Sequence, residues 1–182
     1  MKLTNNINEN EILFYEEQKP ARKWLICVIL FYSVFITYLT YEQVFLKKMV
    51  FDLPFSNKIW LLLWFFFALV LPVLFFLSKM KTEVRQNGIY IKYFPFYLNF
   101  VKISPEDIQS FESVIYNPLK DYGGWGLRYG VKGNAISAYG NKGINIKITY
   151  ARDMLIGTQK PDELFNAIEK LKANYIEPQS KQ

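Results

Sequence analysis

The stretch that decides the fold is Ile59–Ser78, IWLLLWFFFALVLPVLFFLS, which contains 20 residues and no charge. A second uncharged run, Trp24–Tyr41 (WLICVILFYSVFITYLTY), has 18 residues and ends 17 residues earlier. At about 1.5 Å per residue, helices of these lengths reach roughly 27–30 Å, the thickness of the hydrocarbon core of a bilayer. The two runs therefore predict a transmembrane hairpin over residues 24–78, with spans at about 24–44 and 59–78.

The composition of the chain changes after Lys81. Apolar residues number 50 among residues 1–81 (62%) but only 43 among residues 82–182 (43%), and all nine glycines lie in the second part. The overall value of 51% apolar over 182 residues thus averages a membrane anchor and an ordinary soluble domain. Four glutamates precede the first run, and no small-residue cleavage site follows it. We therefore expect no signal peptide and a first helix that is retained in the mature protein.

Basic residues are distributed unevenly around the two runs. Three lie in the connecting segment (Lys47, Lys48 and Lys58), whereas six adjoin the terminal sides of the spans: Lys19, Arg22, Lys23, Lys79, Lys81 and Arg85. By the positive-inside rule, both termini, including segment 1–23, are expected in the cytoplasm, as in a multi-pass protein of the inner (plasma) membrane. We call these six residues the basic collar. They are either an orientation signal only or a contact surface for anionic lipid.

The interiors of the spans carry no charged residue, which disfavours an independent channel or transporter. Ser33, Thr37 and Thr40 share one helix face, where their hydroxyls bond either the carbonyl four residues back or a neighbouring helix. Pro72 should kink the second helix, because its ring cannot donate to the carbonyl of Ala68.

From Thr82 onward the hydrophobic period becomes two, which predicts short strands. The expected strands are Thr82–Gln86, Ile89–Tyr93, Phe100–Ile103, Ile108–Tyr116, Trp125–Val131, Ala135–Tyr139, Gly143–Tyr150 and Asp153–Gly157, with turns at Asn87-Gly88 and Gly133-Asn134. A helix is expected from Pro161, with a buried stripe of Leu164, Ile168 and Leu171. The strand pattern predicts an all-β antiparallel barrel or sandwich. We expect a pleckstrin-homology-like (PH-like) barrel capped by a C-terminal helix over residues 82–176, followed by a flexible tail, 177–182.

Short antiparallel strands followed by one C-terminal helix are the architecture of a pleckstrin-homology (PH) domain. Four stretches of the sequence carry a more specific resemblance. They are Tyr15–Gln18 (YEEQ), Tyr116–Gly130 (YNPLKDYGGWGLRYG), Ala135–Gly143 (AISAYGNKG) and Leu155–Leu164 (LIGTQKPDEL). These resemble the motifs, including YGGWGxRYG, of a prokaryotic family of unknown function with two transmembrane helices and a C-terminal PH-like domain, related to bacterial PH-domain membrane proteins. The chain departs from it at Tyr150–Asp153 (YARD), where a glycine-containing turn is expected. The resemblance implies a fold and a topology, and no activity.

Composition excludes several kinds of chemistry. The chain has no histidine and one cysteine, Cys27, so Ser-His-Asp and Cys-His catalysis, zinc and haem ligation and an intrachain disulfide are excluded. No metal or cofactor is expected. The net charge of +6 is split evenly between the two parts, and lysine outnumbers arginine, so nucleic acid is not expected as a partner.

The glycine-rich segment Gly123–Gly130 (GGWGLRYG) is the main candidate binding site. Its spacing from Gly124 is G-x-G-x-x-x-G, followed by strands, which does not fit a dinucleotide fingerprint. Either the glycines allow a sharp bend while Trp125 packs on the domain, or the segment is an exposed recognition loop. We refer to this candidate recognition loop by its residues Gly123, Gly124, Trp125, Gly126, Arg128 and Tyr129.

Acidic residues of the soluble part show no pairing suited to hydrolysis, so we expect no enzyme. We expect instead a non-catalytic binding or scaffolding module tethered to the membrane, with a protein partner. The alternatives are an anionic-lipid-sensing domain at the inner membrane surface and an accessory subunit of a transporter.

Overall fold

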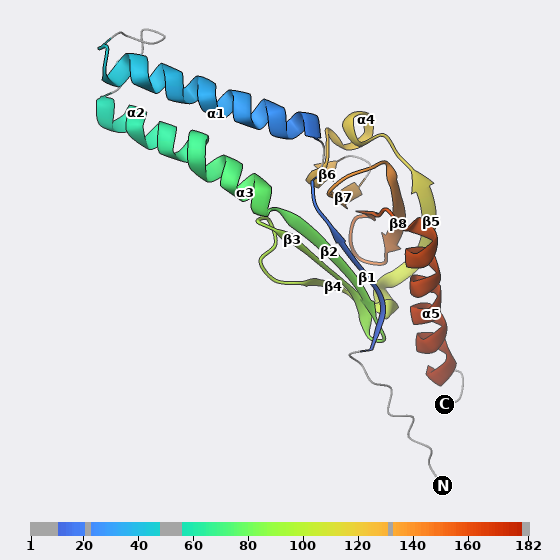
Figure 1. Ribbon diagram of the computed structural model, residues 1–182. Helices are drawn as coiled ribbons and strands as arrows, with labels where there is room; N and C mark the ends of the chain where they lie inside the picture. The colour runs from blue at the N-terminus through green and yellow to red at the C-terminus, as the bar shows by residue number, and fades with distance from the viewer. Residues whose placement is uncertain (1–10, 21–22, 48–55, 131–132, 180–182) are drawn as a thin grey trace. The chain divides into compact units, whose positions relative to one another are not determined.

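The computed structural model describes residues 11–20, 23–47, 56–130 and 133–179. The chain divides into two compact units, Pro20–Ser78 and a second unit that combines Met1–Lys19 with Lys79–Gln182. We call the first the helical hairpin and the second the β-domain. The hairpin is thus an insertion between the first strand of the β-domain and all of its other strands (Figure 1).

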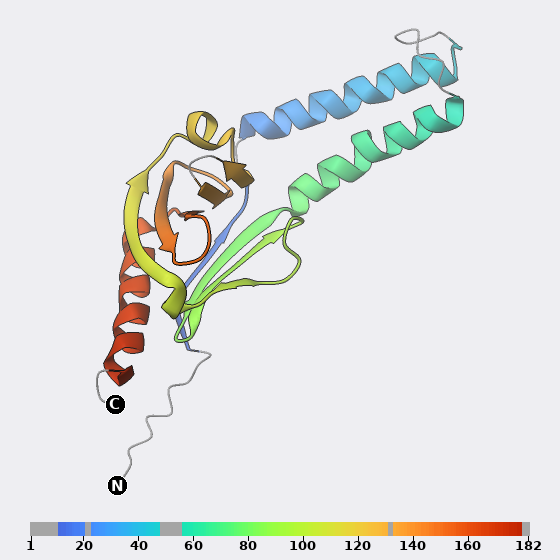
Figure 2. The same cartoon turned by 180° about the vertical axis from the view of Figure 1, so that it is seen from behind.

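The helical hairpin consists of α1 (Lys23–Val44) and a second rod formed by α2 (Asn57–Trp64), the π-helical η1 (Phe65–Val70) and α3 (Leu71–Leu77). The two rods lie side by side (Figures 1 and 2). Two stretches, Ile26–Val44 and Asn57–Leu77, are long and apolar enough to cross a membrane. Few of their side chains are buried, and Phe31 and Val34 are 74% and 69% exposed, which is unlike the core helix of a soluble protein.

The second rod departs from a regular α-helix just before Pro72, where the sequence predicts a kink. The turn before it is a π-helix, in which the Leu71 N–H donates to the carbonyl of Phe66, five residues back. The wider turn accommodates a residue that has no N–H to donate.

The three hydroxyls of α1 follow both of the expected alternatives. Ser33, Thr37 and Thr40 each donate to the carbonyl four residues back, at 2.9, 2.8 and 2.9 Å. Thr37 Oγ1 also accepts a hydrogen bond of 3.0 Å from Trp64 Nε1 on the other rod. The two rods are therefore joined by a polar contact as well as by apolar packing.

The first sheet of the β-domain is antiparallel, in the order β1 (Ile12–Gln18), β2 (Lys79–Arg85), β3 (Gly88–Phe94) and β4 (Val101–Ile103). The sequence predicts a separate segment over residues 1–23 and a domain that begins at residue 82. Both boundaries are corrected by the pairing of β1 with β2, in which Gln18 lies opposite Met80.

The second sheet has the order β5 (Ile108–Ile115), β8 (Lys142–Ile148), β9 (Met154–Gly157), β7 (Gly133–Ser137) and β6 (Gly126–Gly130). Its strands are antiparallel except for the parallel pair β7–β9. Gly133 and Asn134 begin β7, so the expected turn at these two residues is wrong. The predicted strand end at Val131 lies outside the described residues.

The expected barrel is corrected, because the strands of the described residues form two separate sheets and no closed barrel is found among them. The reason lies between β4 and β5. There β4 has only three residues, and Pro105 opens a short 3-10 turn, η2 (Pro105–Asp107), before the chain enters the other sheet. A proline cannot extend a strand ladder by donating to it, so pairing does not continue from one sheet to the next.

One core joins both sheets to α5 (Pro161–Gln179). The predicted stripe of Leu164, Ile168 and Leu171 is fully buried, and α5 contacts strands of both sheets (Figure 2). The prediction of a flexible tail over residues 177–182 is wrong for residues 177–179, which belong to α5. Residues 180–182 lie outside the described residues.

Candidate functional site

The candidate recognition loop is preceded by a short helix that the sequence pattern does not predict, α4 (Pro118–Tyr122). Asn117 caps it, since its side-chain oxygen accepts hydrogen bonds from the backbone of Leu119 and Lys120, at 3.2 and 3.1 Å. Gly123 ends the helix in the left-handed conformation (φ 71°), which glycine adopts without strain. The Gly124 N–H donates to the carbonyl of Pro118, at 2.8 Å, and completes the cap.

Trp125 is held by the domain. It is half-buried, and its indole N–H donates to the carbonyl of Gly140, at 2.8 Å. Gly126 is buried and has a φ of 108°, so it supports the bend into β6. Arg128 and Tyr129 are exposed on β6. Structural roles therefore account for four residues of the loop, Gly123, Gly124, Trp125 and Gly126. Only Arg128 and Tyr129 remain as candidate recognition residues.

The basic collar does not form one cluster. Lys79 and Lys81, at the start of β2, lie 3.9 and 3.3 Å from the carboxylate of Glu17 on β1. Arg85 is at the other end of β2, six residues and roughly 20 Å away, where it pairs with Glu83 at 2.6 Å. Of the remaining members, Lys19 is exposed after β1, Lys23 begins α1, and Arg22 lies outside the described residues.

Glu17 partly neutralises the lysines at the start of β2. A hydrogen bond with Lys81 is the largest cause that lowers the pKa of Glu17, and the charge of Lys79 acts in the same direction. The same hydrogen bond raises the pKa of Lys81. These two lysines therefore form a local ion-pair group, which weakens an interpretation of the collar as a free cationic surface.

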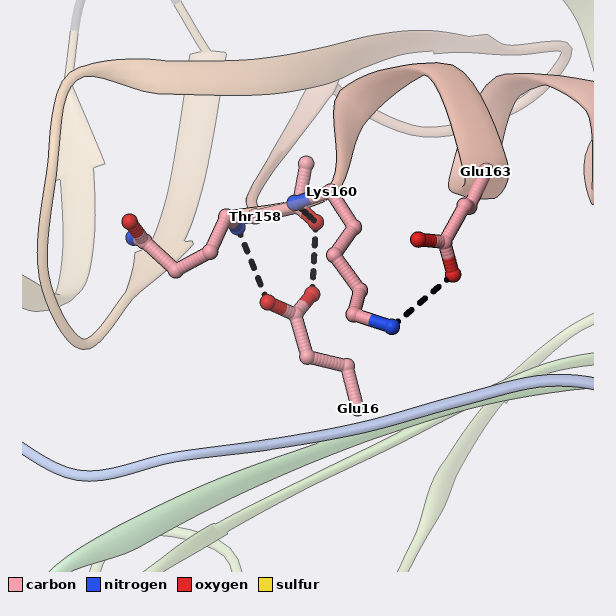
Figure 3. A network of polar contacts seen from close by, with 5 residues as sticks. Glu16, Thr158, Lys160 and Glu163 are labelled. Atoms are coloured by element: carbon pink, nitrogen blue, oxygen red, sulfur yellow. Dashed lines mark hydrogen bonds and ion pairs between the residues drawn. The ribbon is translucent and has the colours of Figure 1, made fainter.

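A buried carboxylate joins the first strand to the start of the last helix (Figure 3). Glu16 on β1 is only 7% exposed. Its Oε2 accepts a 2.5 Å hydrogen bond from the Thr158 hydroxyl, and its Oε1 accepts a 2.9 Å bond from the Gln159 backbone N–H. Both partners lie just before α5, whose N-terminal end favours a negative charge. Glu16 therefore stabilises the helix entry from a strand that precedes the hairpin.

The neighbouring Gln18 is almost fully buried as well. Its Nε2 donates to the carbonyl of Gly157 at 2.8 Å, while its Oε1 is buried with no hydrogen-bond partner among the described residues. A groove of about 410 Å³ opens beside it, with lining residues from β1, the end of β7 and the entry of α5: Tyr15, Glu16, Glu17, Gln18, Lys19, Tyr139, Gln159 and Lys160.

This groove was missed by the sequence analysis, although three of the four quoted motifs meet in it. YEEQ supplies the strand, AISAYGNKG supplies Tyr139, and LIGTQKPDEL supplies Gln159 and Lys160. The strand was missed because Phe14, Glu16 and Gln18 share the inward face, so two polar residues stand where alternation predicts apolar ones. The run Ile12–Tyr15 was the signal that could have revealed it.

Comparison with known proteins supports the expectation that the chain belongs to an uncharacterised family. A family model described as a family of unknown function (DUF6141) matches residues 6–175. This range includes β1, the hairpin and nearly all of α5. No match was found among curated proteins or among solved structures. Because the family model covers most of the chain, the protein belongs to this family of unknown function, DUF6141.

Proposed function

We propose that this protein is a non-catalytic binding module, a PH-like β-domain tethered to the inner membrane by two spans, which holds a segment of a partner protein in the groove beside β1. The observation that carries the proposal is the groove of about 410 Å³, which exposes two tyrosines, Tyr15 (46%) and Tyr139 (36%), beside β1. Tyrosine is enriched where proteins bind one another, so a segment of a partner protein is favoured there.

The lining of the groove suits a peptide better than a lipid headgroup. The groove combines two tyrosines, Tyr15 and Tyr139, with polar side chains, a composition typical of protein-binding surfaces. The lysines at this end of β2 are already engaged by Glu17, which disfavours the alternative of an anionic-lipid sensor. No particular contact favours the transporter-subunit alternative over other protein partners.

Site-specific photocrosslinking in cells tests the groove. A benzophenone amino acid replaces Tyr139, which lines the groove, or Tyr150, which is 96% exposed and does not line it. We expect a discrete crosslinked protein product from position 139 only. Crosslinks of equal yield at both positions, or none at position 139, would contradict a groove-bound partner.

Cysteine labelling tests the membrane tether separately. In a Cys27→Ala background, a membrane-impermeant maleimide should label Ser56→Cys, between the two rods, in intact cells. It should label Ile176→Cys on α5 only after the membrane is opened. The reverse pattern would overturn the proposed cytoplasmic side, and extraction of the chain by alkaline carbonate would overturn membrane insertion.

A further inference from the structure

The loop between β3 and β4, residues 95–100 (PFYLNF), is unusually apolar for a surface turn. Phe96, Leu98 and Phe100 are 57%, 64% and 38% exposed. Surface turns are normally rich in glycine, asparagine, aspartate and serine, because these residues favour turn geometry and water. Three large apolar side chains therefore face outward from six consecutive residues, and we call this segment the aromatic loop.

The aromatic loop has a defined conformation. The Tyr97 N–H donates to the carbonyl of Tyr93, at 2.7 Å, and the Tyr97 hydroxyl lies 3.2 Å from that of Tyr129 on β6. Tyr97 also packs against the core of the β-domain, and Phe96 contacts the ring of Tyr93 edge-on, with 5.4 Å between centroids. With Tyr97 directed inward, the neighbouring Phe96 and Leu98 are presented outward.

Covalent connections limit the distance between this loop and the end of the helical hairpin. Lys79 follows Leu77, the last residue of α3, by two residues, which span at most about 7 Å. Phe94, which immediately precedes the loop, is the antiparallel partner of Lys79, about 5 Å across the sheet. Whatever the orientation of the two units, Phe94, the residue before the loop, therefore lies within roughly 12 Å of the helix end.

We propose that the aromatic loop inserts Phe96 and Leu98 into the interfacial layer of the same bilayer that the hairpin crosses, while Phe100 stays packed against the ring of Tyr90. This inference rests on the proposed membrane tether. The polar layer on each side of the hydrocarbon core is about 5–8 Å thick, and a bound of roughly 12 Å to Phe94 leaves the layer within reach of the loop side chains when the β-domain tilts toward the membrane. Aromatic and leucine side chains favour that layer, and burying them there removes apolar surface from water.

Insertion would also fix how the β-domain faces the membrane. The chain leaves the domain after Gln18 and re-enters at Lys79, two connections that lie side by side at the end of the first sheet. Two adjacent tethers allow the domain to tilt about the line joining them. The aromatic loop supplies a third point of attachment, and three points define a plane.

An environment-sensitive fluorophore on the full-length protein tests this proposal. The probe is attached to Leu98→Cys, with Phe96→Cys as a second position, in a Cys27→Ala background. The protein is reconstituted in phosphatidylcholine vesicles with or without a nitroxide quencher near the headgroups. Ile176→Cys is the matched control, because it is 57% exposed and lies near Asn174, which bonds Gln86 at the opposite end of the first sheet. Val34→Cys, in the middle of α1, reports the tether itself and is read with a second lipid whose nitroxide lies deep in the acyl chain.

We expect blue-shifted emission at positions 98 and 96 that is lost with the nitroxide lipid and is insensitive to salt, with no such loss at position 176. Quenching at position 34 without quenching at positions 96 and 98 would overturn loop insertion and leave the tether intact. A blue shift without lipid quenching would also overturn it and would indicate a protein contact. Absence of quenching at all positions, including 34, would overturn the tether and this inference together.

Discussion

Gln18, five residues before α1, lies directly opposite Met80, three residues after α3. The pairing means that the helical hairpin is inserted into a sheet instead of being attached to one end of a domain. Both connections to the hairpin are therefore fixed to neighbouring strands, and a displacement of either rod acts on the same edge of the β-domain.

Replacing Glu16 should destabilise the β-domain. In Glu16→Ala the Thr158 hydroxyl and the Gln159 N–H lose their acceptor, so we expect a loss of about 2–3 kcal/mol in the free energy of unfolding. Denaturant unfolding in detergent measures it. Glu163→Ala, which removes an exposed ion pair with Lys160, should cost less than about 0.5 kcal/mol. Equal effects of the two substitutions would contradict a structural role for Glu16.

Trp125→Phe separates the two interpretations of the glycine-rich segment. Loss of the indole N–H leaves the Gly140 carbonyl unpaired and should lower stability by about 1 kcal/mol. Arg128→Glu, on the exposed side of β6, should change stability by less than about 0.5 kcal/mol. Thermal unfolding followed by circular dichroism compares them. If the arginine variant were the more destabilised, the structural assignment of this segment would be wrong.

The pair formed by Tyr97 and Tyr129 should make stability depend on alkaline pH. The hydrogen bond with Tyr129, and secondarily burial, raises the pKa of Tyr97 to about 12. An unfolded tyrosine titrates near 10, so the folded state favours the neutral phenol. This contribution is present below pH 10 and is lost as the pH rises from about 10 to 12.

Tyr129→Phe should lower the pKa of Tyr97 toward its ordinary value and reduce this loss of stability. The measurement is the free energy of unfolding at pH 9 and above pH 11, compared between the two proteins so that the titration of lysines cancels. An unchanged pH dependence in the variant would show that the hydroxyl contact does not stabilise neutral Tyr97.

Trp64→Phe should loosen the helical hairpin. The substitution removes the bond to Thr37 Oγ1 and keeps an aromatic ring, and interhelical hydrogen bonds of this kind contribute about 0.6–1.7 kcal/mol. Unfolding in mixed detergent micelles measures the loss. Thr37→Val should have a similar effect, and the double variant should cost less than the sum of the two. Additive effects would indicate that the two side chains do not interact.

Much of the fold could be predicted from the sequence because its signals are local. The uncharged runs, the alternation around Ile144 and Ile146 and the stripe of α5 each reflect burial on one side of a regular element. The separation of the strands into two sheets could not be predicted in this way. It depends on how the chain passes Pro105, and strand propensities alone do not distinguish two sheets from a barrel.

The candidate site was harder to predict, because it depends on residues distant in the chain. Glu16 and Thr158 are separated by 142 positions, and neither looks unusual alone. Glu16 and Gln18 occupy inward positions where the strand pattern predicts apolar residues. Alternation fails at β1 because these two side chains find polar partners at the end of β9 and in the segment before α5, which only the fold brings near. In the glycine-rich segment, by contrast, the structural alternative could be stated from sequence for Gly123 and Trp125.

The insertion of the hairpin within the first sheet has a consequence for biosynthesis. β1 is made first, and about 60 residues pass before its partner β2 follows. If only one of the two spans crossed the bilayer, β1 and β2 would be stranded on opposite sides, and β2 would keep an open edge prone to aggregation. Under the proposed membrane tether, completion of the first sheet therefore requires that both ends of the hairpin lie on the same side of the bilayer.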